Sequence, residues 1–93
     1  MTLGDLCEVK VNFPDADFWI QRRGTPENVG KVSMDFDKEK IGIKVKDPTV
    51  LMPRYLYYVM MNLYNKGFYR DKMQGATALQ HIKSSDIRNI PVG

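Results

Sequence analysis

The chain has 93 residues, of which 43% are hydrophobic, 11% aromatic and 27% charged. This size and composition predict one small globular domain, residues 1–93, and disfavour an intrinsically disordered chain. The net charge of +3 permits nucleic-acid binding without requiring it. The single cysteine excludes an internal disulfide, and the absence of a long apolar run or a signal-peptide pattern predicts a cytoplasmic protein without a membrane partner.

The first half of the chain predicts a small β-sheet. Apolar and polar residues alternate from Cys7 to Phe13 and again over 41–46, which is the period of a half-buried strand. Between them, residues 18–23 begin with aromatic and β-branched side chains, and residues 29–34 predict a further strand. The stretch 24–28 has the composition of a turn.

The second half predicts one main helix at about residues 53–66. Pro53 suits the first turn of a helix, and Lys66 with Gly67 is typical of a helix C-terminus. The apolar positions that form one broad face are Tyr55, Leu56, Val59, Met60 and Leu63.

Shorter elements are expected after this helix. Residues 68–73 either continue it or begin a second short helix, and 74–77 has the composition of a loop. Residues 84–87 predict a helical turn with Ser84 as N-cap, and 90–92 an extended exit. The expected fold is therefore α+β: a small, twisted, mostly antiparallel sheet packed by one main helix and short C-terminal helical turns.

The other side of the main helix is also apolar, which is typical of a helix that is buried on several sides or meets a partner. We predict that four of its residues form an interface: Tyr57, Tyr58, Met61 and Tyr64. The alternative is that the helix belongs entirely to the core.

The sequence offers no convincing catalytic or metal site, so no enzymatic activity and no cofactor are expected. Cys7 and His81 are the only nucleophile–base pair, and a cysteine within a strand pattern is usually a buried hydrophobe. The acidic residues of 35–39 lack the glycine and glutamate of an EF-hand. The stretch from Gly24 to Gly30 is one residue too long for a P-loop.

Basic residues suggest a binding surface instead. Arg22, Arg23 and Lys31 flank the glycine-containing turn, and Lys44 and Lys46 share one face of a predicted strand. If the strands pair, these cations could gather at one edge and neutralise phosphates. An ordinary charged strand face is the alternative.

The order of several short motifs resembles the target recognition domain of type I restriction-modification specificity subunits. The segments that carry the resemblance are 16–24 (ADFWIQRRG), 29–32 (VGKV), 51–58 (LMPRYLYY), 64–67 (YNKG), 75–82 (GATALQHI) and 86–92 (DIRNIPV). Together they span about residues 16–92. The resemblance implies sequence-specific reading of double-stranded DNA by loops.

Two contact loops follow from the resemblance. One would contain Arg22, Arg23, Thr25 and Lys31; the other would contain Thr77, Gln80 and His81. Glutamine can pair bidentately with adenine, and arginine with guanine.

The resemblance also implies partners in a methyltransferase or restriction complex. Family members usually have two such domains joined by long helices, whereas this sequence holds one unit, so we expect a stand-alone relative, a mobile-element derivative or a minimal half-unit. A two-fold homodimer could supply a second unit. The alternative function is a protein-interaction module that docks on a restriction or methylation enzyme without binding DNA.

Overall fold

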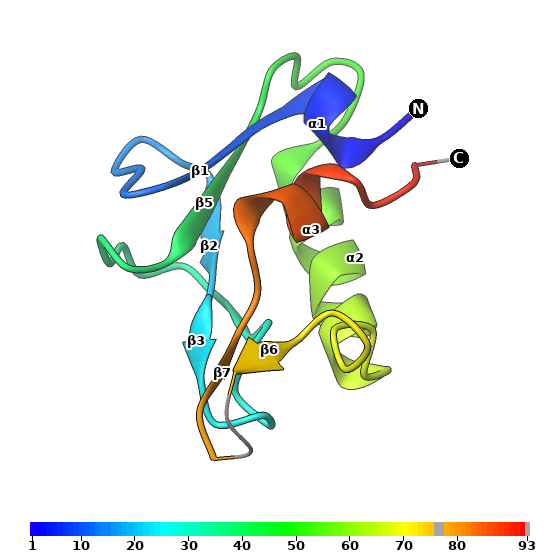
Figure 1. Cartoon of the computed structure of the whole chain (residues 1–93). Coiled ribbons are helices and arrows are strands. Elements are labelled where there is room, and N and C mark those ends of the chain that lie inside the picture. The colour runs from blue at the N-terminus through cyan, green and yellow to red at the C-terminus, as the bar shows by residue number, and fades with distance from the viewer. Residues whose placement is uncertain (76–77, 93) are drawn as a thin grey trace.

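Two antiparallel sheets organise the chain, which a computed structural model describes over residues 1–75 and 78–92 (Figure 1). The larger sheet has the strand order β1-β5-β2-β4 and the smaller has the order β3-β7-β6. The strands of the larger sheet are β1 (Cys7–Val11), β2 (Phe18–Ile20), β4 (Val32–Ser33) and β5 (Ile41–Val45). Those of the smaller sheet are β3 (Arg23–Gly24), β6 (Gln74–Gly75) and β7 (Gln80–His81).

Helices cover one face of the larger sheet (Figure 1). They are α1 (Leu3–Leu6), α2 (Pro53–Asn65) and α3 (Ser84–Arg88). Alternate strand residues point to this face and pack against buried side chains of the helices, among them Leu56 and Met60 of α2. The α+β fold expected from the sequence is therefore confirmed.

The opposite face of the larger sheet is partly closed by the loop after β1. The indole N–H of Trp19 donates to the carbonyl oxygen of Phe13 at 2.9 Å. A Cβ at Gly42 would stand 2.7 Å from the Cβ of Phe13, so this strand position admits no side chain. The loop after β1 therefore packs on β2 and β5, and the chain runs on from β2 to the candidate site.

The long elements lie where the sequence predicts them. The main helix ends at Asn65 with Lys66 as C-cap, and Gly67 adopts a φ of +75°, as the pattern indicates. The strand at 7–13 stops at Val11 because Asn12 has a φ of +56° and turns the chain. No helix within the described residues combines the length and apolar character needed to cross a membrane.

The short elements differ from the predictions. Residues 74–75, predicted as loop, form β6, and 80–81 form β7; two-residue strands are too short to show a period. Residues 68–72 form turns rather than a helix. The N-cap of α3 is Lys83, one residue before Ser84, and its backbone N–H donates to the Asp86 carboxylate at 2.8 Å.

Candidate nucleic-acid interface

The smaller sheet brings the two predicted contact segments together. Strand β3 pairs with β7, with Arg23 opposite His81 and Gly24 opposite Gln80. The pairing continues beyond the strand, since the N–H of Ile82 donates to the carbonyl oxygen of Arg22 at 2.9 Å. About 58 residues of sequence separate the partners, yet hydrogen bonds fix their relative positions.

A cleft of about 480 Å³ opens beside this strand pair. It is lined by Arg22, Arg23, Gly24, Leu79, Gln80 and His81. Four of these are residues predicted to contact DNA. Strand partners directly opposite each other share a face, so the side chains of Arg23 and His81 emerge together. Gln80, the neighbour of His81 in β7, lies opposite Gly24 and points to the other face, so the cleft is lined by residues from both faces of the strand pair.

The loop between β3 and β4 is stiffened by its own hydrogen bonds. The carbonyl oxygen of Thr25 accepts hydrogen bonds from the backbone N–H groups of Asn28 (2.9 Å) and Val29 (3.2 Å). The Thr25 hydroxyl accepts a further one from the side-chain amide of Asn28 at 2.8 Å. The Thr25 side chain therefore shapes the turn. At the base of the loop, the backbone of Gln21 pairs with that of Lys31, whose side chain is exposed.

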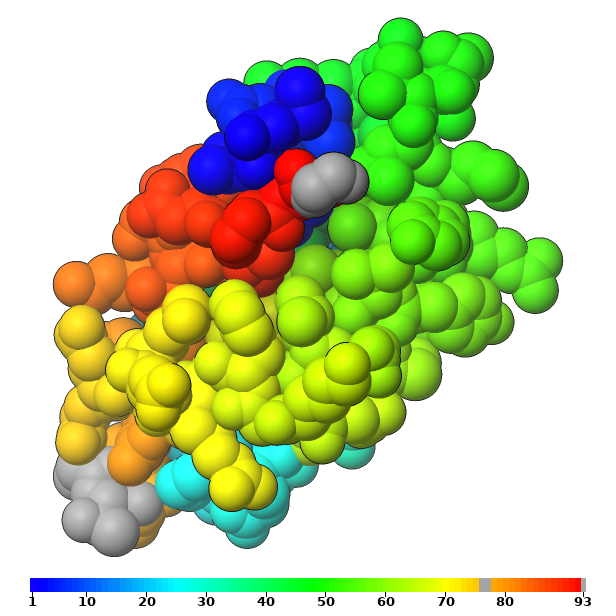
Figure 2. All heavy atoms as spheres, turned by 90° about the vertical axis from the view of Figure 1, so that its right-hand side faces the viewer, coloured from blue at the N-terminus to red at the C-terminus, as the bar shows by residue number. Residues whose placement is uncertain are grey.

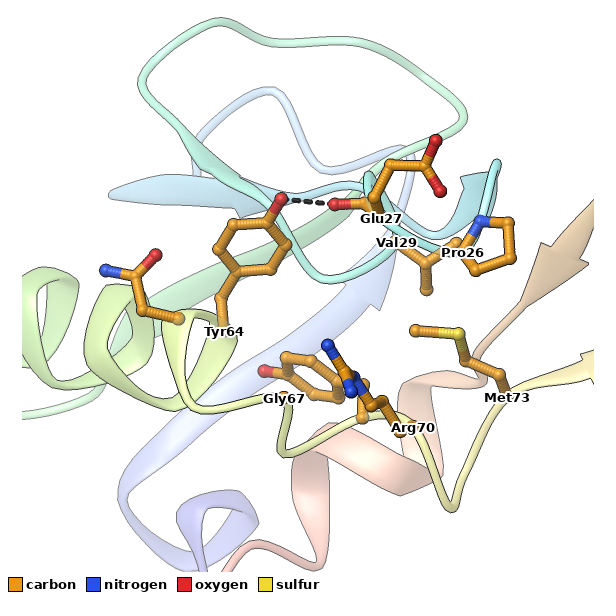
Figure 3. A pocket seen from close by; sticks show the side chains of 9 residues that line it. Pro26, Glu27, Val29, Tyr64, Gly67, Arg70 and Met73 are labelled. Carbon is orange, nitrogen blue, oxygen red and sulfur yellow. Dashed lines mark hydrogen bonds between the residues drawn. The ribbon is translucent and has the colours of Figure 1, made fainter.

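Two tyrosines support the same loop from α2 and the turn that follows it. Gly30 has a φ of +92°, and a Cβ there would stand 2.3 Å from Cδ2 of Tyr69, whose ring is buried. The hydroxyl of Tyr64 donates to the carbonyl oxygen of Glu27, as Figure 3 shows. The conformation of the loop therefore depends on packing against the helical layer.

One carboxylate partly neutralises the arginines of the cleft. Glu39 Oε1 lies 3.2 Å from a terminal nitrogen of Arg22 and 3.4 Å from one of Arg23. The Nε of Arg22 also donates to the Glu39 backbone oxygen at 3.0 Å. Two guanidinium groups share one carboxylate, so a single positive charge remains uncompensated among these three residues.

The structure does not bring Lys44 and Lys46 to this cleft, so the gathering of all five cations at one edge is wrong. Strand β5 is internal to its sheet, and only its first residue, Ile41, lies opposite Ile20, the end of β2 that leads to the arginines. Lys46 lies five residues further on, about 16 Å along the strand. There the ammonium group of Lys46 donates to the Gly4 carbonyl oxygen at 3.4 Å, and that of Lys44 donates to the Asp15 carbonyl oxygen at 3.2 Å.

The residues predicted as an interface are spread along α2. Tyr57 packs edge-to-face on Phe18 and on Tyr58, which is 53% exposed. Met61 and Tyr64 are half-buried and pack against the core. Their role as an interface stays a prediction, and the predicted contact residue Thr77 lies outside the described residues.

Cys7, which the strand pattern predicts to be a buried hydrophobe, lies in the core. Cys7 is 2% exposed, and burial raises the pKa of its thiol to about 11, so little thiolate exists near neutral pH. Among residues 1–75 and 78–92, no group of three or more potential ligands gathers to hold a metal ion. Binding by polar and cationic groups is the chemistry that the described cleft offers.

Comparison with known proteins concerns the fold. No protein-family model matches the sequence, and no curated protein matches it. The fold is similar to part of a solved type I restriction-modification S subunit, as the resemblance implied. The solved neighbour is the S subunit of a type I restriction-modification system from M. genitalium, with a TM-score of 0.71 and 14% sequence identity. The match covers 97% of this chain and 32% of that chain, so the chain spans about a third of the neighbour's length.

Proposed function

We propose that the chain is a non-enzymatic DNA-recognition module that binds double-stranded DNA through the cleft beside β3 and β7 and through the 25–30 loop. The observation that carries the proposal is the pairing of Arg23 with His81 and of Gly24 with Gln80. It unites two separately predicted contact segments on a fold shared with a restriction-modification S subunit. By the same likeness, methyltransferase or restriction subunits are the protein partners that we propose.

The chemistry of the cleft suits both parts of DNA recognition. Arg23, whose side chain is 60% exposed, can donate to a phosphate or bidentately to guanine. The Gln80 amide can pair with the N6 and N7 edge of adenine. Lys31, at the base of the loop, is exposed and supplies a further phosphate contact.

Fluorescence anisotropy with a random duplex tests the proposal. Two to three phosphate contacts give a salt slope of about −1.8 to −2.7, so raising salt from about 50 to about 200 mM should weaken binding by about 10- to 40-fold. The double variant Arg23→Gln, Lys31→Gln should bind more weakly, and its salt slope should be shallower by about 1 to 2.

A matched control comes from the two lysines that lie away from the cleft. Lys44→Gln with Lys46→Gln removes the same total charge and should change the salt slope little. Equal losses in the two double variants would contradict the assignment of the cleft. No binding by the wild-type chain at low salt would remove the DNA-binding function and leave the protein-interaction module as the alternative.

A further inference from the structure

A second cavity, of about 260 Å³, lies between the 26–29 part of the loop and the segment that follows α2 (Figure 3). Its lining residues include Pro26, Glu27 and Val29 from the loop and Tyr64, Arg70 and Met73 from the helical side. The continuous stretch from Arg22 to Val29 thus contributes to this cavity and to the cleft described above. The space-filling view shows the loop next to the turn after α2 (Figure 2).

Arg70 is the cation of this second cavity. It is exposed, and no carboxylate within residues 1–75 and 78–92 lies close enough to form an ion pair with it, in contrast to Arg22 and Arg23. Its guanidinium points toward the loop, while the Glu27 carboxylate points away from it (Figure 3). The positive charge of Arg70 is therefore available to an external anion.

The position of Arg70 relative to the loop is fixed by its neighbours. The preceding residue, Tyr69, is buried with its ring against Gly30. A Cβ at Gly67 would stand 2.9 Å from the Nε of Arg70, so the arginine side chain lies close against this glycine. The contact of Tyr69 with Gly30 thus places the backbone of Arg70 beside the loop.

We infer that Arg70 is a further DNA contact, binding a backbone phosphate at the cavity between the 25–30 loop and the turn after α2. This inference rests on the proposed function. A DNA groove is bordered by phosphates of both strands, and the major groove is about 12 Å wide. Arg23 lines the cleft and Arg70 lines the second cavity, and the chain from Arg22 to Val29 contributes to both. A loop that enters a groove therefore brings both guanidinium groups toward the phosphates that border it.

The test compares Arg70→Gln with the control Arg54→Gln. Arg54 is exposed and lies in the first turn of α2, and its replacement removes the same charge. Binding to a random duplex is measured over a series of salt concentrations. Arg70→Gln should lower the steepness of the salt dependence by about 0.9, the value of one phosphate contact, and Arg54→Gln should leave it unchanged. Arg70→Lys keeps the cation and should keep the wild-type slope.

The outcomes separate the inference from the function on which it rests. If Arg23→Gln with Lys31→Gln weakens binding and Arg70→Gln behaves as Arg54→Gln does, Arg70 makes no phosphate contact and only the inference is wrong. If the wild-type chain binds no duplex at low salt, the proposed function fails and the inference fails with it. Circular dichroism of each variant establishes that the fold is retained.

Discussion

Replacing Glu39 by glutamine is expected to strengthen DNA binding. The carboxylate of Glu39 lies 3.2 Å from Arg22 and 3.4 Å from Arg23, so it competes with an incoming phosphate for both guanidinium groups. Glutamine keeps the size of the side chain and the backbone oxygen to which Arg22 donates, while it removes the charge. Because the Glu39 side chain is 53% exposed, the two ion pairs contribute little to folding, about 0 to 1 kcal/mol each.

The gain in binding comes from two sources. The arginines no longer have to leave a carboxylate, and the carboxylate no longer repels the phosphate. For charges in water-like surroundings, the two effects together should improve the binding free energy by about 1 kcal/mol, which is about fivefold in affinity. The salt dependence should also become steeper, because more cations contact phosphates.

Fluorescence anisotropy at low salt measures this change, and Glu8→Gln is the matched control. Glu8 lies in β1, opposite Lys44 and away from the cleft, so its replacement adds the same net charge at another place. An affinity of Glu39→Gln equal to that of Glu8→Gln would show that only net charge matters. Weaker binding than the wild type would show that Glu39 positions the arginines for DNA, contrary to our reasoning.

Two further predictions concern stability. Gly30→Ala places a methyl group against the Tyr69 ring at a φ of +92°, so urea denaturation should show a loss of about 2 kcal/mol or more, and wild-type stability would contradict the contact. Burial raises the pKa of Cys7 from 9.0 to about 11, so its thiol ionises at lower pH in the unfolded chain than in the folded one. The free energy of unfolding should therefore hold below about pH 9 and fall as the pH rises toward 11, with a smaller decline in Cys7→Ala; an equal decline in both proteins would refute this role for Cys7.

Strands and helices whose apolar residues recur at a regular spacing could be predicted from the sequence. The pairing of short segments that lie far apart in the sequence could not. Alternation identified β1 and β5, and the apolar face with Pro53 and Gly67 identified α2, because these patterns follow from local geometry. Strand β7 has two residues, and only its partner β3, far away in sequence, defines it. The sequence therefore predicts two separate contact loops where the structure has one cleft.

The electrostatics of the site could not be predicted for the same reason. Glu39 is 17 residues from Arg22, and in the sequence it stands with Asp35 and Asp37 as an acidic stretch without an EF-hand pattern. Arg70 lies in a turn without regular pattern, and only the contact of Tyr69 with Gly30 places it beside the loop. A motif consists of residue types at a fixed spacing in the sequence. The position of Glu39 beside the arginines and of Arg70 beside the loop depends instead on how the whole chain folds.

A titration of the isotope-labelled chain with a DNA duplex, followed by two-dimensional NMR of its backbone amides, tests most directly where the molecule meets DNA. We expect the largest shifts in the amides of 23–31, 70 and 80–81, with little change at Lys44, Lys46 and Tyr58. Shifts confined to those last three positions, or no shift at low salt, would contradict the account.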